Sequence, residues 1–208
     1  MSGAKSLSEA RRLETLWAGR FGDKYNERNK EGYAGRGRFW REFLPALGVK
    51  SVLEVGCNIG GNLQWIVELV PARQVWGIDI NEAALTQLRV SLPGVNALWS
   101  PARELPFRDG YLDLVFTAGV LIHQPEESLS QVMSEIVRCS RRWVLCMEYF
   151  SGNTVEVPYR GNVRALFKRD YGKKYLKGFP ELKLIQQGGL GKSDGWDNVT
   201  YWLFRKGR

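Results

Sequence analysis

Short apolar runs alternate with longer amphipathic stretches from residue 50 onward, and this alternation limits the possible folds more than any other feature of the sequence. The apolar runs predict strands at residues 51–56, 74–79, 95–99, 112–117 and 143–149. The amphipathic stretches predict helices at residues 61–70, 81–91 and 125–139, with Asn81 as a helix N-cap. Strands that alternate with such helices are typical of βαβ units in a parallel, doubly wound sheet.

The two ends of the chain complete the fold prediction. Residues 182–187 and 199–204 are apolar runs with no helix between them, so they predict an antiparallel hairpin at one edge of the sheet. Near the N-terminus, Ser6 and Glu9 fit a capping box that starts a helix at Ser6, and a second helix ends at Gly48. The predicted fold class is α/β: a doubly wound, mostly parallel seven-stranded sheet with an antiparallel edge hairpin and N-terminal helices. The single domain, residues 1–208, divides into a helical cap (1–49), a core (50–149), an irregular insertion (150–181) and a final strand pair (182–208).

Composition excludes several other classes of protein. Hydrophobic residues make up 44% and charged residues 25% of the chain, which is ordinary for a globular domain and excludes a disordered or low-complexity segment. No apolar run reaches the roughly 18 residues of a membrane span, and the first residues lack the apolar core of a secretory signal. A cytoplasmic protein without a membrane partner is therefore expected. With three cysteines, no Cys-x-x-Cys pair and one histidine, no metal site is expected either.

Charge is distributed unevenly along the chain. Residues 1–50 carry 11 basic and 6 acidic side chains, residues 51–140 carry 5 and 10, and residues 141–208 carry 14 and 6. One interpretation is ordinary solvated surface charge. The other is that the two basic flanks converge on an anionic partner while the acidic centre holds a cationic or neutral ligand. Composition alone leaves open whether that partner is a small acid, a nucleotide-sugar or a nucleic acid.

A glycine-containing loop follows the first predicted strand and indicates a ligand. The loop runs from Glu54 through Gly56 and Asn58 to Gly60, and Asp79 ends the next strand, where a carboxylate can accept both ribose hydroxyls. A plain strand–helix turn would explain the loop alone, but the loop, the spaced acid and the βαβ context together predict an adenosine-containing ligand. The spacing departs from G-x-G-x-x-G, and the Glu54 carboxylate would repel a pyrophosphate. A cationic ligand such as S-adenosyl-L-methionine suits Glu54 better.

Several ordered motifs resemble class I S-adenosylmethionine-dependent methyltransferases. Residues 54–60 are similar to the motif E/D-x-G-x-G-x-G with Asn58 at the middle glycine, and residues 78–81 resemble the second motif of the family. Residues 102–115 resemble A-x-E-L-P-F-x-D-x-x-F-D-x-V, and residues 120–125 resemble L-x-H-x-P. Pro101 stands where the family often has the aspartate that binds adenine, which leaves the backbone of Ala102 and the neighbouring Arg103 for that task. The flanks, residues 17–29 and 157–172, resemble methylases associated with pseudaminic acid biosynthesis.

The resemblance implies that the core, residues 50–149, holds the cofactor and that the insertion, residues 150–181, faces the acceptor. It also implies roles for particular residues. The residues expected to bind S-adenosyl-L-methionine are Tyr25, Glu54, Gly56, Cys57, Asn58, Gly60, Asn62, Asp79, Ile80, Ala102, Arg103, Thr117 and Gly119. Within this set, Tyr25 either closes over the cofactor or simply packs the end of a helix, and Thr117 and Gly119 are expected beneath the methionine portion.

The acceptor side has its own candidates. His123 is either a catalytic base or a structural residue that bonds nearby backbone, and Glu148 and Tyr149 are alternative catalytic groups. The residues expected to bind the acceptor, or to be exposed polar side chains, are Arg28, Asn29, Tyr159, Arg160, Lys168 and Arg169. The expected function is methyl transfer to a small anionic acceptor, such as a sugar acid or a nucleotide-sugar. An RNA methyltransferase and a non-catalytic S-adenosylmethionine-binding partner protein remain alternatives, and the oligomeric state is left open.

Overall fold

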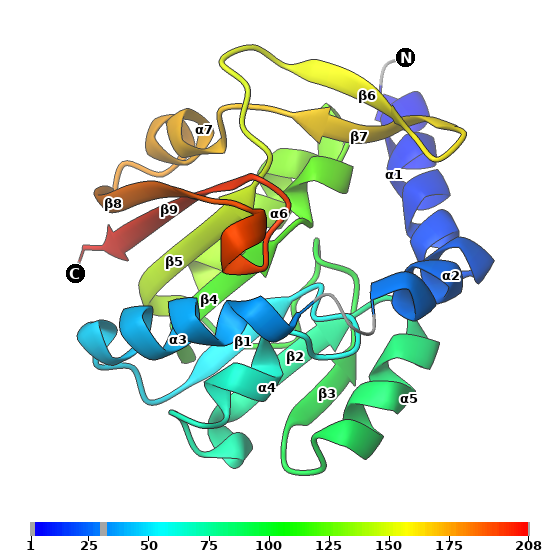
Figure 1. Cartoon of the computed structure of the whole chain (residues 1–208). Helices are drawn as coiled ribbons and strands as arrows, with labels where there is room; N and C mark the ends of the chain where they lie inside the picture. The colour runs from blue at the N-terminus through cyan, green and yellow to red at the C-terminus, as the bar shows by residue number, and fades with distance from the viewer. Residues whose placement is uncertain (1–2, 30–32, 208) are drawn as a thin grey trace.

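A computed structural model describes residues 3–29 and 33–207, and its centre is a seven-stranded sheet (Figure 1). The strand order is β3-β2-β1-β4-β5-β9-β8, in which β1 to β5 are parallel and β9 is antiparallel to both of its neighbours. The strands are β1 (Val52–Val55), β2 (Val75–Asp79), β3 (Asn96–Trp99), β4 (Leu112–Ala118), β5 (Ser140–Glu148), β8 (Leu182–Leu190) and β9 (Val199–Lys206). The predicted fold class is confirmed. The order also places β1 and β4 side by side at the centre, where ligands bind in open α/β sheets.

Helices cover both faces of the sheet. They are α1 (Gly3–Ala18), α2 (Arg20–Asn29), α3 (Gly37–Phe43), α4 (Leu63–Ile66), α5 (Glu82–Ser91), α6 (Glu126–Cys139) and α7 (Tyr171–Gly178). Successive strand residues point to opposite faces, so Val115 joins one buried cluster with α6 and α7, while Leu114 joins another with α3, α4 and α5. α3 and α6 lie on opposite sides of the sheet (Figure 1). Within the described residues, no helix has the length and apolar character needed to cross a membrane.

The N-terminal helices differ from the prediction in where they begin. α1 starts at Gly3, so Ser6 lies inside the helix and the predicted capping box is wrong. Ala4 and Lys5 are good helix formers, which explains why the helix extends past the capping signal. Near the start of α2, a Cβ at Gly22 would lie 1.9 Å from the Trp17 carbonyl oxygen, so only glycine allows α1 and α2 to pack this closely. The helix predicted to end at Gly48 is divided: α3 ends at Phe43, a 3₁₀ turn follows at Pro45–Leu47, and Gly48 ends that turn in a left-handed conformation.

Two further segments differ from their predicted structure. Of the helix expected at residues 61–70, only α4 is helical. The chain then continues in turns to Pro71, which disfavours a helical conformation in the residue before it. Residues 150–181 are not irregular: β6 (Val155–Tyr159) and β7 (Asn162–Lys168) form a separate antiparallel hairpin, followed by α7. The hairpin reaches α1 (Figure 1), where Arg12 donates to the carbonyl oxygens of Val163 and Arg164 at 3.2 and 3.4 Å.

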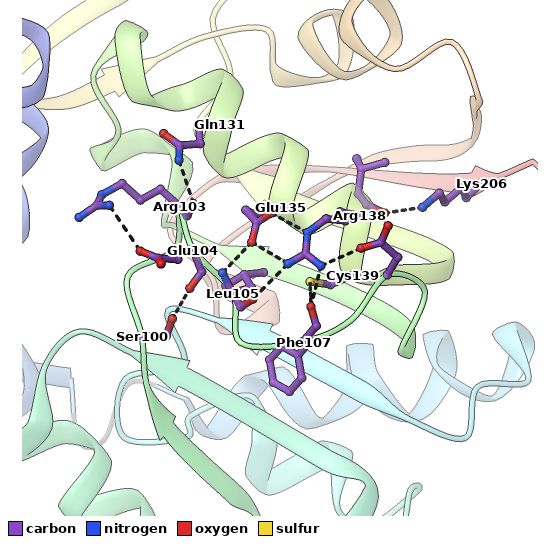
Figure 2. A network of polar contacts seen from close by, with 12 residues as sticks. Ser100, Arg103, Glu104, Leu105, Phe107, Gln131, Glu135, Arg138, Cys139 and Lys206 are labelled. Atoms are coloured by element: carbon purple, nitrogen blue, oxygen red, sulfur yellow. Dashed lines mark hydrogen bonds and ion pairs between the residues drawn. The ribbon is translucent and has the colours of Figure 1, made fainter.

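The segment before β4 is held by one arginine at the end of α6 (Figure 2). Arg138 donates to the carbonyl oxygens of Phe107 and Leu105 at 2.6 and 3.1 Å, and it pairs with the carboxylates of Asp109 and Glu135 at 2.9 and 2.6 Å. Glu135 in turn accepts from the Leu105 backbone N–H at 2.7 Å. The network thereby fixes the loop that connects the carboxyl end of β3 to β4.

We expect Arg138→Ala to lower the free energy of unfolding by about 1–2 kcal/mol, because several charge-assisted bonds to a partly exposed group are lost together. Urea unfolding measures the change. Arg205→Ala is the matched control, since Arg205 is exposed on β9. Equal stability of the two variants would show that the network does not contribute to holding the loop.

Candidate active site

A cavity opens at the carboxyl ends of β1, β2 and β4 beneath α1 and α2, and most of the predicted cofactor residues line it. Those that do are Tyr25, Glu54, Gly56, Cys57, Asn58, Asn62, Asp79, Ile80, Ala102, Arg103 and Gly119. The structure places Gly60 and Thr117 outside the lining. Gly60 closes the loop by donating to the Cys57 carbonyl at 3.0 Å, and Thr117 is buried in β4, with its hydroxyl facing Glu148.

The loop between β1 and α4 owes its shape to left-handed residues. A Cβ at Gly56, where φ is +75°, would lie 2.4 Å from the Val120 side chain. Asn58 has a φ of +49°. Asparagine is one of the few residues other than glycine that adopts this conformation readily, which explains how the motif tolerates Asn58 at the middle glycine.

Glu54 supplies a buried carboxylate to the cavity. Its Oε1 accepts from Asn62 Nδ2 at 2.6 Å, while its buried Oε2 has no hydrogen-bond partner among the described residues. Burial raises the pKa of Glu54 to about 8. An unpartnered carboxylate oxygen in such a cavity fits a cationic ligand group, such as the ammonium of S-adenosylmethionine.

Arg36 is a functional candidate that the sequence interpretation missed. Its guanidinium lies between the rings of Trp196 and Tyr33, 4.0 and 4.5 Å from their centroids, and donates to Asn62 Oδ1 and to the Gly195 carbonyl, both at 3.1 Å. It lines the cavity on the side of Glu54 and Asn62. A guanidinium placed beside an unpartnered carboxylate oxygen fits a zwitterion. Arg36 and Glu54 together therefore match the carboxylate and the ammonium at the amino-acid end of S-adenosylmethionine.

Asp79 ends β2 with both carboxylate oxygens fixed. They accept from the backbone N–H groups of Asn58 and Asn81, each at 2.8 Å, and burial raises the pKa of Asp79. Its position on the lining fits ribose hydroxyls. Asn26 of α2, a second missed residue, donates to Asn81 at 3.1 Å and accepts from Asn58, so α2 is tied directly to the cofactor loop.

Ala102, which was expected to contact adenine, lines the cavity, as does Ile80, which was expected at the ribose. Arg103 also lines it, but its guanidinium forms a two-pronged ion pair with Glu14 of α1, at 2.7 and 3.1 Å. The Arg103 side chain therefore links the helical cap to the core, which makes contact between this side chain and adenine less favourable.

A second cavity adjoins the first and contains most of the predicted acceptor residues. Its lining includes Arg28, Asn29, His123, Tyr149, Tyr159 and Arg160. Trp196 and Asp197, from the segment before β9, also line it and were not anticipated. Tyr25, Arg36, Ala118, Gly119 and His123 line both cavities, so this is where a cofactor and an acceptor would meet.

Three of the residues expected on the acceptor side line neither cavity. Arg169 is only 1% exposed and donates to the Gln124 carbonyl at 3.0 Å, so the structure contradicts its expected contact with an acceptor. Glu148 is fully buried and accepts from the backbone N–H groups of Val120, Leu121 and Ile122, so it holds the turn before α6 instead of touching a ligand. Lys168 lies beside Tyr149, with its Nζ 5.9 Å from the ring centroid.

His123 stands at the junction of the cavities in the short 3₁₀ turn η4 (Leu121–His123). Its Nδ1 lies 2.6 Å from the Ala165 carbonyl oxygen, and its ring packs 4.4 Å from that of Trp17 and 5.4 Å from that of Tyr159. A carbonyl oxygen only accepts hydrogen bonds, so Nδ1 carries the proton. Burial lowers the pKa of His123 to about 4, which keeps the imidazole neutral at neutral pH.

Comparisons with known proteins find similarity to methyltransferases. Residues 52–142 match the family model described as "Methyltransferase domain". A phthiotriol/phenolphthiotriol dimycocerosates methyltransferase from Mycobacterium ulcerans is 33% identical over 94 residues, 44% of this chain and 34% of the relative. A tRNA U34 carboxymethyltransferase from Syntrophotalea carbinolica is 33% identical over 105 residues, covering 46% and 32%. The chain thus spans about a third of the length of the curated relatives it matches.

A solved structure extends the comparison to nearly the whole chain. Magnesium protoporphyrin IX methyltransferase from Synechocystis, with bound S-adenosylhomocysteine, superposes with a TM-score of 0.71 at 14% identity, covering 94% of this chain and 99% of the other. The molecule bound in that structure is the demethylated form of the cofactor predicted here from the sequence. Residues 52–142 therefore match a methyltransferase-domain model, and the chain as a whole has the fold seen in class I S-adenosylmethionine-dependent methyltransferases.

Proposed function

We propose that the protein transfers a methyl group from S-adenosylmethionine to a small anionic acceptor bound in the second cavity. The observation that carries this proposal is the junction at Gly119 and His123, where the first cavity meets one lined by Arg28 and Arg160. When bound, S-adenosylmethionine supplies an electrophilic methyl group on a sulfonium. Glu54, Arg36 and Asp79 would orient it, and the cap helices would exclude water.

The charge of the second cavity supports an anionic acceptor. Among the described residues, Arg28 and Arg160 have no carboxylate within salt-bridge distance, so both remain available to a ligand. Asp197 is the one acidic side chain on the lining that the structure describes. A carboxylate or phosphate would form bidentate contacts with the arginines. The resemblance of the flanks to methylases associated with pseudaminic acid biosynthesis also favours a sugar acid or a nucleotide-sugar.

Labelled cofactor tests this function directly. Purified protein, S-adenosyl-L-methionine and the small-molecule fraction of a cell extract should yield S-adenosylhomocysteine and one metabolite heavier by one methyl. Binding of the cofactor without turnover in any extract would favour the non-catalytic alternative.

RNA is the second candidate acceptor, because Arg28 of α2 and Arg160 of the hairpin line the second cavity and both flanks of the chain are basic. Transfer RNA should then bind with an affinity that falls steeply as salt rises, by roughly three decades between 50 and 200 mM if six or more phosphates are contacted. Weak binding to tRNA, together with methylation of a small metabolite, would exclude RNA.

Arg160→Asn should raise the acceptor KM roughly ten- to a hundredfold, since one charge-assisted contact is worth about 1.5–3 kcal/mol. Asparagine is chosen because Arg160 and Gly161 form a left-handed turn, with φ of +48° and +81°, for which Asn-Gly is the favoured pair. The fold should therefore persist. Steady-state kinetics with the metabolite identified above measure KM, and calorimetry should show unchanged S-adenosylhomocysteine binding. An unchanged KM would make Arg160 a surface charge.

A further inference from the structure

The imidazole of His123 is packed between two aromatic rings at the junction of the cavities, with one ring nitrogen engaged and the other without a partner among the described residues. Nδ1 donates to the Ala165 carbonyl of β7, and Trp17 and Tyr159 pack against the ring. Since Nδ1 carries the proton, Nε2 has a lone pair and can only accept. No described residue hydrogen-bonds Nε2, while His123 lines both cavities.

We infer that Nε2 of His123 accepts the proton of an acceptor hydroxyl, so that the methylated atom is oxygen. The inference rests on the proposed function. The hydroxyl oxygen forms a bond to the methyl carbon as the carbon–sulfur bond breaks, and the electron pair of that bond goes to sulfur, giving S-adenosylhomocysteine. The hydroxyl proton moves to Nε2, and the imidazolium then releases it to water.

The chemistry of His123 distinguishes oxygen from nitrogen and carbon acceptors. A hydroxyl becomes strongly acidic as its oxygen is methylated, so a weakly basic, neutral imidazole is a sufficient proton acceptor. An alkylammonium must lose its proton before it can attack, and its pKa near 10 lies far above that of an imidazole lowered by burial. A carbon nucleophile that is already electron-rich needs no base at the moment of attack. The arrangement is therefore matched to a hydroxyl.

Other titratable groups face the same space, so an activity profile against pH alone would be ambiguous. Those that line the second cavity with His123 are Tyr25, Arg28, Arg36, Tyr149, Tyr159, Arg160 and Asp197, and the lining of the first cavity adds Glu14, Tyr33, Glu54, Cys57, Asp79 and Arg103. Behind the turn lies Glu148, whose pKa burial raises to about 7. A readout specific to the imidazole is needed.

The first experiment needs no acceptor. His123 is the only histidine of the chain, so nitrogen NMR of its imidazole is unambiguous. With S-adenosylhomocysteine bound at pH 7, we expect a protonated Nδ1 and an unprotonated Nε2. A protonated Nε2 or a cationic ring would overturn the inference.

The second experiment identifies the methylated atom. S-adenosyl-L-methionine carrying ¹³C in its methyl group is incubated with the protein and the small-molecule fraction of a cell extract. The carbon shift of the product should be that of a methoxy group, and an N-methyl or C-methyl shift would overturn the inference. Absence of any labelled product counts against the proposed function instead, and the imidazole spectrum still decides this inference.

His123→Asn separates a base from a structural residue. The asparagine amide can still donate to the Ala165 carbonyl, but it has no basic lone pair. The initial rate of methoxy formation should fall about a hundredfold or more, while S-adenosylhomocysteine affinity stays within about twofold. His123→Gln should behave in the same way if the asparagine variant folds poorly. A wild-type rate in either folded variant would make the role of His123 structural only.

Discussion

Glu54→Gln is expected to weaken S-adenosylhomocysteine binding about a hundredfold at pH 8. S-adenosylhomocysteine keeps the ammonium of the methionine portion and is not consumed, which makes it the suitable probe. Glutamine keeps the shape and the bond from Asn62, but it cannot become the anion that Glu54 Oε2 offers. Leaving the ligand ammonium without its buried partner costs about 3 kcal/mol, which is about a hundredfold in affinity.

Binding should also depend on pH through the same carboxyl. Because burial raises the pKa of Glu54 to about 8, the unliganded protein holds this group mostly protonated at pH 6–7, and ion pairing requires the proton to leave. Affinity for S-adenosylhomocysteine should therefore rise at least about tenfold between pH 6 and pH 8. Well above pH 8 it should fall again, once the ligand ammonium loses its own proton and can no longer pair with the Glu54 carboxylate.

Calorimetry in buffers of different ionisation enthalpy measures both effects. At pH 7 we expect release of close to one proton from the wild type and of none from Glu54→Gln. The matched control is Glu181→Gln, since Glu181 is exposed and lies just before β8. A pH-independent affinity in the wild type would mean that Glu54 does not pair with the ammonium, even if S-adenosylhomocysteine binds.

The core of the fold was predictable because its signals are local. Leu53 and Val115 lie in apolar runs that could only be buried strands, and both are fully buried. Asn81 is a helix N-cap by residue type, and its side chain does accept from the Ala84 backbone N–H at 2.7 Å. The hairpin β6–β7 escaped prediction because Arg160 occupies a left-handed turn position where asparagine is the usual signal.

Residues of the helical cap were harder to assign, because their contacts join distant segments. Arg36 bonds the carbonyl of Gly195, and Asn26 bonds Asn81, with no spacing rule connecting either pair. Conversely, residue type alone places Glu148 and Arg169 at the protein surface or in a binding site, although both are buried. Charge alone does not reveal which ionised groups find enough internal hydrogen bonds to offset the loss of water.

Arg169 provides the second test with a large expected effect. The side chain is 1% exposed, its Nη1 donates to the Gln124 carbonyl at 3.0 Å, and its Nε lies 3.3 Å from the Glu126 carboxylate. The guanidinium carbon also lies 4.3 Å from the centroid of the Phe167 ring. Arg169→Ala would remove these contacts and leave a cavity and an unpaired carbonyl. We expect the free energy of unfolding to fall by about 2–4 kcal/mol.

The neighbouring residue gives the matched control. Lys168 makes no buried contact of this kind, so Lys168→Ala should change stability by only about 0.5 kcal/mol or less. Arg169→Met keeps most of the side-chain volume without the charge, and should recover part of the loss, because filling the space offsets the cavity but not the lost bond to Gln124. Urea unfolding of the three variants separates these contributions. The acceptor KM of folded Arg169→Ala should stay at the wild-type value, since the side chain lines neither cavity. A raised KM with unchanged stability would instead return Arg169 to the acceptor site.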